Sequence, residues 1–194
     1  DVYKRQILYI TEQYKKNPAI TTVTHRNFNR IDNFSAFLTA SPAVGSWHPQ
    51  LTVGVQKQWA KIEHNGETLQ MDTPLFFCTL NNGIQLPYHW TLSTDINFQS
   101  KGDYQNIYMY QNVFMMNATL TKSFLNEHLS IHLQGIDLTH GRKDGNRIYN
   151  KHMNMDVANV SDSRELRFTI RYKFNTAKSK YKGKGAATEE IKRL

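Results

Sequence analysis

The chain has 194 residues, a net charge of +8 and a single cysteine, Cys78. One cysteine excludes an internal disulfide framework and any metal site built from several thiolates. Its longest uninterrupted apolar runs, such as residues 7–10, have four residues, whereas a membrane-spanning helix needs about 20. Transmembrane helices are therefore excluded, and composition alone describes a basic, soluble protein of one or two domains.

Apolar and polar residues alternate with period two along almost the whole chain before residue 176. Such alternation predicts β-strands with one apolar and one polar face. The expected strands lie near residues 3–14, 21–40, 50–62, 73–86, 90–100, 105–124, 128–138 and 164–174. The clearest is the last, whose apolar face is formed by Leu166, Phe168, Ile170, Tyr172 and Phe174. The pattern predicts an all-β protein.

The connections between these strands are of two kinds that alternate along the chain. The turn-like links are residues 41–45, 86–89 and 125–128, and the longer, polar links are residues 15–20, 60–73, 100–106 and 139–163. In an up-and-down antiparallel sheet, alternate connections lie at the same end. Long strands with tight turns at one end and elaborate loops at the other predict a transmembrane β-barrel. A soluble, lipocalin-like barrel or a sandwich has the same alternation with its faces reversed, and this alternative stays open.

If the apolar face points outward, the polar residues of the strands line a hydrated lumen. The lumen-facing candidates are Gln56, Gln58, Asp95, Asn97, Gln99, His132, Gln134, Arg167 and Arg171. The cations of the last strand could pair with acidic groups or attract an anionic solute. Residues 139–163 are expected to face a ligand, because long loops carry recognition. The candidates there are Arg142, Lys143, Asp144, Tyr149 and Lys151.

No arrangement of residues indicates covalent catalysis or a cofactor. Asp137 and His140 at a strand end lack a recognisable nucleophile, and His128 and His132 on one strand lie about 13 Å apart, too far for one metal ion. We expect no enzymatic activity, no metal and no cofactor. Residues 176–194 carry six Lys and Arg against two Glu, which predicts a flexible basic tail. We expect no nucleic-acid binding, because nothing else resembles a nucleic-acid module.

Several segments resemble a known family. Residues 41–47 (SPAVGSW), followed by residues 51–59 (LTVGVQKQW), are similar to the SP-x-(I/V)-G-x-W and L-x-V-G-x-Q-x-Q-W hairpin of an outer-membrane β-barrel family. That family is allied to the TonB-dependent receptors of Gram-negative bacteria. The ending of the chain, residues 170–175 followed by the Lys/Gly segment 180–187, resembles the end of such barrels.

The resemblance implies a receptor with an N-terminal plug and a barrel of about 22 strands. Residues 7–175 would be a C-terminal fragment of about eight strands in the cell outer membrane, with residues 176–194 in the periplasm. Residues 1–6 resemble a non-native lead-in. The implied partners are outer-membrane lipid, the plug and remaining barrel strands, the TonB system and the barrel assembly machinery.

The function that this family implies is uptake of a large or scarce solute across the outer membrane. The last strand would serve as the assembly signal, through Phe168, Ile170, Tyr172 and Phe174. A porin-like channel, an adhesin and a complete eight-stranded barrel stay open as alternatives.

Overall fold

The computed structural model describes residues 8–14, 20–27, 30–160 and 162–174. The expected lead-in, residues 1–6, and the expected tail, residues 176–194, lie outside the described residues. None of the described segments is a helix long and apolar enough to span a membrane.

The described residues form fourteen strands and no helix, in agreement with the all-β prediction. Their bounds are β1 Leu8–Tyr14, β2 Thr21–Asn27, β3 Asp32–Ala40, β4 Trp47–His64, β5 Glu67–Met71, β6 Leu75–Leu86, β7 Trp90–Gln99, β8 Gly102–Tyr104, β9 Ile107–Met109, β10 Val113–Phe124, β11 Leu129–Ile136, β12 Lys143–Tyr149, β13 Asn154–Val160 and β14 Glu165–Tyr172.

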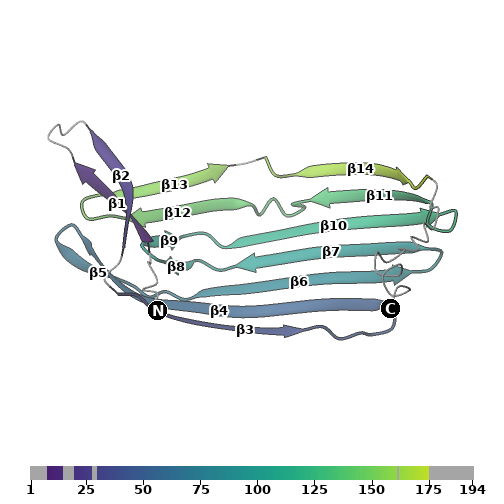
Figure 1. The fold of residues 1–194 in the computed structure, drawn as a ribbon, viewed down its shortest axis with the longest axis horizontal. Helices are drawn as coiled ribbons and strands as arrows, with labels where there is room; N and C mark the ends of the chain where they lie inside the picture. The colour runs from purple at the N-terminus through teal and green to yellow at the C-terminus, as the bar shows by residue number, and fades with distance from the viewer. Residues whose placement is uncertain (1–7, 15–19, 28–29, 161, 175–194) are drawn as a thin grey trace, which may run out of the picture.

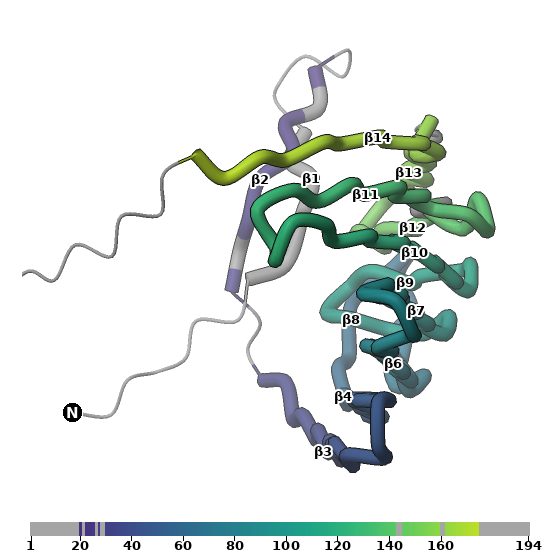
Figure 2. The backbone as a smooth tube through the Cα atoms, turned by 90° about the vertical axis from the view of Figure 1, so that its right-hand side faces the viewer, coloured from purple at the N-terminus to yellow at the C-terminus, as the bar shows by residue number. Residues whose placement is uncertain are grey.

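Seven long strands, which we call the wall, form the main path of an eight-stranded sheet in which β5 also pairs with β4. Its order is β14–β11–β10–β7–β6–β4–β3, and every neighbouring pair is antiparallel. The strands lie side by side along the molecule in Figure 1. Viewed from the side in Figure 2, the wall curves into an arc that stays open between β3 and β14. The arrangement is that of an up-and-down sheet, and it is not closed into a barrel.

The two kinds of connection lie at opposite ends of the wall, as predicted. The short links β3–β4, β6–β7 and β10–β11 meet at the end that we call the turn end, and the long connections meet at the loop end (Figure 1). In the β3–β4 link, Gly45 has a φ of 59°, a conformation that glycine adopts without steric cost. The sequence pattern therefore located both ends correctly.

The register of the wall gathers the apolar residues on one face. One row of directly paired residues runs Leu38, Val53, Cys78, Phe98 and Phe114. A second row runs Ile84, Leu92, Leu120, Leu133 and Phe168. Because side chains alternate between faces along each strand, these rows share one face. Many of these side chains are exposed, among them Phe168 at 62%, so the wall has a continuous uncovered apolar surface.

The buried apolar residues among those described lie at the loop end, where the long connections pack together. We call this part the cap; it comprises residues 60–64 of β4 with β5, β8, β9, β12 and β13. Its small core is Ala60, Ile62 and Met71. Ile31, Leu69, Tyr108 and Tyr149 pack against that core. The cap therefore has an interior, as a water-soluble domain does.

The structure differs from the sequence prediction in strand number and in the form of the loops. The expected loops 60–73, 100–106 and 139–163 contain or contribute to the hairpins β4–β5, β8–β9 and β12–β13. The expected strand 21–40 divides into β2 and β3, and β2 pairs with β1 in a separate sheet. The expected strand 105–124 divides into β9 and β10. These cap strands are short, and packing between hairpins determines them more than local alternation does.

Candidate functional site: the concave face and the cap

The polar face of the wall lines the inside of the arc. Gln58 and Leu75 lie on this face, in alternation with outward-facing residues of β4 and β6. Both contact the β8–β9 hairpin: Gln58 bonds to Gln105, and Leu75 packs beneath Gly102. Figure 2 shows β8 and β9 on the concave side of the wall. The cap therefore folds inward over the concave face.

The nine lumen-facing candidates share this polar face. The row Ser93, Thr119, Gln134 and Arg167 crosses β7, β10, β11 and β14. The row Thr39, Thr52, Thr79 and Asn97 crosses β3, β4, β6 and β7. Asp95, Arg167 and Arg171 are exposed, whereas Gln56, Asn97, Gln99, His132 and Gln134 are half-buried. The face is hydrogen-bonded across strands, because Thr79 Oγ1 donates to Asn97 Oδ1 at 3.1 Å.

Gln58 differs from the other eight candidates because it is buried, with 2% of its surface exposed. Its Nε2 donates to the carbonyl oxygen of Gln105 at 2.7 Å, and the Gln105 amide donates back to Gln58 Oε1 at 2.6 Å. The paired hydrogen bonds hold the tight β8–β9 turn, in which Gln105 has a φ of 57°, against β4. Gln58 is a positioning residue of the cap and does not line an open lumen.

His132 and Arg167 have partners within the wall. His132 lies at hydrogen-bond distance from two hydroxyls, Thr121 Oγ1 at 3.0 Å and Ser130 Oγ at 2.9 Å. Arg167 forms an ion pair with Glu165 of its own strand, with Nη2 to Oε1 at 2.9 Å. Its charge is therefore already balanced locally.

The ligand-facing candidates of residues 139–163 lie in or beside a hairpin. Tyr149 packs edge-on against His64, with ring centroids 5.5 Å apart, and Lys151 pairs with Glu63 at 3.2 Å. Both side chains therefore have partners on β4, where the β12–β13 hairpin docks, and their ligand-facing role stays a prediction. Arg142 is exposed, and Lys143 and Asp144 begin β12.

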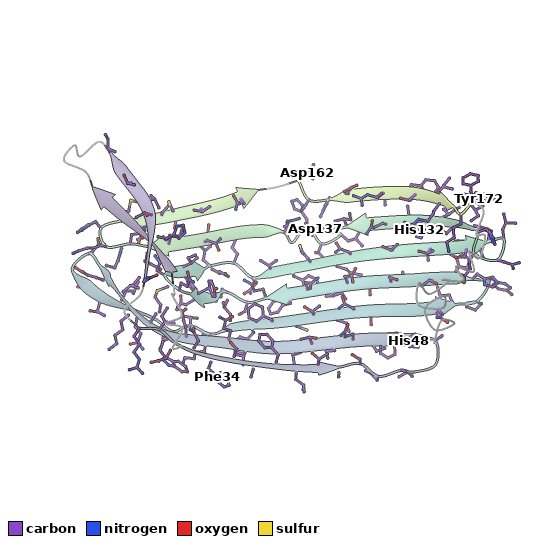
Figure 3. The ribbon with its side chains drawn as sticks, in the orientation of Figure 1. Phe34, His48, His132, Asp137, Asp162 and Tyr172 are labelled. Atoms are coloured by element: carbon purple, nitrogen blue, oxygen red, sulfur yellow. The ribbon has the colours of Figure 1, made fainter. Side chains whose placement is uncertain are left out.

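Asp137 organises the junction between the wall and the cap, where β11 ends (Figure 3). Its side chain is 1% exposed and accepts hydrogen bonds from the Gly141 amide at 2.8 Å, the Arg142 amide at 3.2 Å and the Ser163 hydroxyl. Burial on its own raises the pKa of Asp137, but these hydrogen bonds and nearby His140 together bring its pKa below the usual value. Asp137 therefore links Gly141 and Arg142, which precede β12, to Ser163, which follows β13.

Further hydrogen bonds connect the segments of the cap to one another, and the sequence pattern did not predict them. The Thr73 amide donates to Asp103 Oδ2 at 2.7 Å, and His64 Nδ1 donates to the Asn150 carbonyl at 2.5 Å. One local signal was available: the dipeptide Asn65-Gly66, with φ values of 51° and 81°, is the favoured turn of a two-residue β-hairpin. It marks the β4–β5 hairpin, which lies within the predicted polar link of residues 60–73.

The expected assembly residues lie on the outward face of the edge strand β14 or just after it. Phe168, Ile170 and Tyr172 are 62%, 61% and 48% exposed, and Phe174 beyond the strand is 82% exposed. The rings of Tyr172 and Phe174 meet edge-on, with centroids 4.6 Å apart. These side chains form one apolar ridge that ends in two aromatic rings at the turn end.

Within the part of the chain that the structure describes, no three His, Cys, Asp or Glu side chains gather as metal ligands would. The expectations of no metal, no cofactor and no catalysis stay predictions. The chemistry that the described arrangement offers is a polar concave surface beneath a folded cap, with an apolar convex surface around it.

The comparisons with known proteins agree with this geometry at the level of the family. A family model described as "Outer membrane protein beta-barrel family" matches residues 2–172. No curated protein and no solved structure matches the chain significantly. An uncovered apolar face with a polar opposite face is what a membrane β-barrel requires. The chain therefore belongs to the outer membrane protein β-barrel family, and its place is the cell outer membrane.

Proposed function

We propose that the chain is the C-terminal part of a larger, TonB-dependent receptor-like barrel that takes up a solute across the outer membrane. The observation that carries the proposal is the direction of the two edge strands. Six successive antiparallel pairings separate β3 from β14, so both edges run from the loop end to the turn end. Edges that run in the same direction cannot pair antiparallel with each other. A closed antiparallel barrel therefore needs at least one further strand between them.

The cap supports a role in solute recognition at the cell surface. In outer-membrane barrels the longer loops are extracellular and the short turns periplasmic, which supports an extracellular position for the cap. Its hairpins pack around a small core, and β8 and β9 lie on the concave side of the wall (Figure 2). A solute would meet this folded surface first and the polar face of the wall next. Movement of a plug, energised through the TonB system, would then open the lumen, and we propose that the protein does no covalent chemistry.

Strand closure can be tested by disulfide crosslinking in a Cys78→Ser background. Thr169→Cys on the polar face of β14 is combined with Thr24→Cys on β2. A disulfide requires Cα atoms within about 7 Å, so we expect no crosslink if further strands separate these elements. The positive control is Thr39→Cys with Thr52→Cys, a directly paired position whose hydroxyls are 3.0 Å apart. Crosslinking of β2 to β14 would indicate a small, complete barrel.

Energised uptake requires a separate experiment in cells. Accumulation of labelled iron chelates, cobalamin and oligosaccharides is compared with and without the gene, and with and without an uncoupler of the proton-motive force. We expect one solute to accumulate only when the gene and the proton-motive force are both present. Gene-dependent accumulation that persists in the presence of uncoupler would identify a passive, porin-like channel.

We propose further that the ridge ending in Phe174 is read by the barrel assembly machinery. Phe174→Asp is expected to lower the amount of folded protein in the outer membrane, because it places a charge at the end of the apolar edge. Leu125→Asp is the control, since Leu125 is also at the turn end and 65% exposed but lies in a turn. Equal surface levels for Phe174→Asp and wild type would contradict this role.

A further inference from the structure

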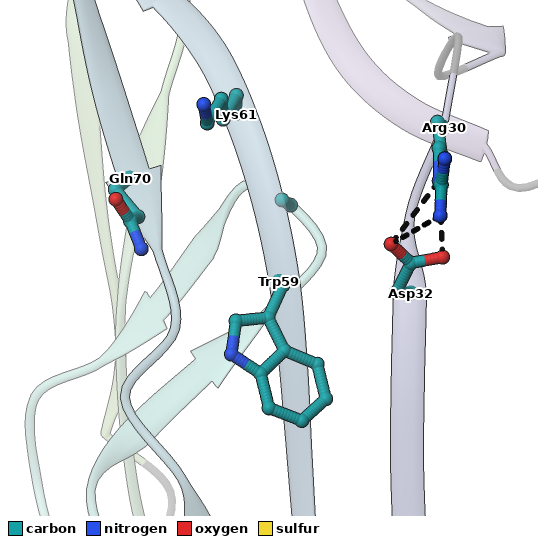
Figure 4. Close-up of a pocket in the computed structure, with 6 residues that line it drawn as sticks. Arg30, Asp32, Trp59, Lys61 and Gln70 are labelled. Carbon is teal, nitrogen blue, oxygen red and sulfur yellow. Dashed lines mark hydrogen bonds and ion pairs between the residues drawn. The ribbon is translucent and has the colours of Figure 1, made fainter.

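A cavity of about 420 Å³ lies between the start of β3 and the β4–β5 hairpin. It is lined by Arg30, Asp32, Trp59, Ala60, Lys61 and Gln70. Figure 4 shows the Arg30–Asp32 ion pair on one side and Trp59, Lys61 and Gln70 on the other. Of the residues that line it, only Ala60 belongs to the cap core.

The register places the cavity on the convex side of the wall. On β4, Ala60 and Ile62 point into the cap core. Because successive side chains of a strand point to opposite faces, the neighbouring residues Trp59 and Lys61 point away from that core. Asp32 is paired with Trp59, and Gln70 is paired with Lys61. Directly paired residues project from the same face. The polar lining therefore faces away from the lumen.

Along this outward face of β4 the chemistry changes abruptly. Leu51, Val53 and Val55 belong to the apolar surface, and the next outward positions are Lys57, Trp59 and Lys61. In an outer-membrane barrel, an aromatic girdle marks the border between hydrocarbon and headgroups. Since the cap is extracellular by its loop lengths, this border is that of the outer leaflet. The cavity therefore lies at the depth of outer-leaflet headgroups.

The side chains at this border combine an exposed aromatic ring with several cationic groups. Trp59 is 45% exposed, and Lys57 Nζ lies 5.3 Å from its ring centroid. Arg30 is held by Asp32, with Nε 3.1 Å from both carboxylate oxygens. Lys and Arg recognise phosphate through charge-assisted hydrogen bonds, and an indole ring offers an apolar face with a polar edge.

We propose that this corner binds the phosphorylated saccharide headgroup of an outer-leaflet glycolipid. Lys57 and Lys61 contact the phosphate groups, the Trp59 ring packs on the sugar, and Gln70 and Asp32 bond to hydroxyls, with Asp32 held in place by Arg30. A sugar–phosphate headgroup fits better than a simple phospholipid because the cavity pairs its cations with an aromatic surface and with neutral and acidic hydrogen-bonding groups. The inference rests on membership of the outer-membrane family and on the proposed extracellular position of the cap, and it is independent of solute uptake.

The test is native mass spectrometry of the detergent-purified protein titrated with bisphosphorylated lipid A, and in parallel with phosphatidylglycerol. The test variants are Lys57→Gln with Lys61→Gln, and separately Trp59→Leu. Lys122→Gln is the matched control, because Lys122 Nζ lies 5.1 Å from the Trp90 centroid and 5.5 Å from that of Phe124 at the turn end. Folding of each variant is checked by the mobility difference between boiled and unboiled samples in gel electrophoresis.

We expect the wild-type protein to bind lipid A more tightly than phosphatidylglycerol. The double lysine variant should bind lipid A about tenfold more weakly, the size expected for two exposed ionic contacts. Trp59→Leu should reduce the preference for lipid A over phosphatidylglycerol, and Lys122→Gln should bind as the wild type does. Equal affinities for the two lipids in the wild type would overturn the proposal. So would an equal loss in Lys122→Gln and the double variant, or unchanged lipid A binding in the double variant.

Discussion

The cap and the wall are both built from antiparallel strands, but they treat apolar side chains in opposite ways. The cap buries them: Ala60, Ile62 and Met71 are each less than a tenth exposed. The wall displays them: Leu38 and Phe168 are 69% and 62% exposed on its apolar face. A water-soluble protein rarely leaves so large an apolar surface uncovered, whereas lipid is the expected neighbour of such a surface in a membrane barrel.

The difference shows that one chain is folded for two solvents. At the loop end, water surrounds the hairpins, so burial of apolar surface and paired polar groups stabilise them. Along the wall, the backbone hydrogen bonds must be complete between strands, and the side chains of the outward face need only match the lipid. Substitutions should therefore affect stability through loss of buried packing in the cap, and through the match between the outward face and lipid in the wall.

The largest effect is expected in the cap. Met71→Ala should destabilise the β4–β5 hairpin by about 2–5 kcal/mol, because it leaves a cavity in a core of only a few residues. Hydrogen exchange should be faster in β5 and in residues 60–64 of β4, with the wall unchanged. Leu125→Ala, at an exposed turn position, should change stability by less than about 0.5 kcal/mol. Unchanged protection of β5 in Met71→Ala would show that the cap core does not stabilise the hairpin.

The wall should respond to charge according to face. Leu133 lies on the apolar face between Leu120 and Phe168, so Leu133→Arg should cost about 2–4 kcal/mol in denaturant unfolding from lipid vesicles. Gln134→Arg, the next residue on the same strand, should cost little because its side chain faces the polar interior. If the two variants lose stability equally, the assignment of faces is wrong.

The junction between the two regions should depend on Asp137. Asp137→Asn replaces an acceptor oxygen by a donor group among three donors, which should cost about 1–3 kcal/mol. The pKa of Asp137 is lowered in the fold, so its stabilisation is present at neutral pH and is lost as the pH falls below about 3.9 toward the folded-state pKa. Burial raises the pKa of Asp103, so this group changes the free energy of unfolding with pH in the opposite direction. Because Asp103 is present in both proteins, its effect cancels when wild type and variant are compared. Parallel stability curves from pH 7 to pH 2 would contradict this role.

The smallest effect is expected for an exposed ion pair of the cap. Arg147 Nε lies 2.6 Å from Asp156 Oδ1, across the β12–β13 hairpin. The hydrogen bond and charge of Arg147 lower the pKa of Asp156, but solvent and salt screen such pairs. Arg147→Gln should leave the melting temperature nearly unchanged at physiological salt. A marked drop would mean that the hairpin depends on this pair.

The local pattern of the sequence was enough to predict the wall. The alternation in Leu166, Phe168 and Ile170 correctly predicted a strand, and the turn-like links correctly predicted which ends of the strands meet. Strands and turns can both be predicted from the sequence, because side-chain direction repeats every two residues in a strand and turns need particular residues. The same pattern also separated the polar from the apolar face without knowledge of any partner strand.

The cap could not be predicted in this way, because its contacts join residues distant in the sequence. Gln58 meets Gln105 across 47 residues, and His64 meets Asn150 across 86. Nothing in the neighbourhood of Gln58 distinguishes it from Gln56, yet one is buried and the other half-buried. Only the inward fold of the β8–β9 hairpin decides between them.

The sequence by itself therefore determined the element type, the two faces and the two ends of this protein, since each of these follows from neighbours in the chain. The tertiary structure alone decided that the polar links are hairpins with a core of their own, and that β1 and β2 stand apart from the wall. It also decided that the edges β3 and β14 run in the same direction. The physical reason is that strand pairing and packing depend on contacts between segments far apart in the sequence, and local alternation does not specify those contacts.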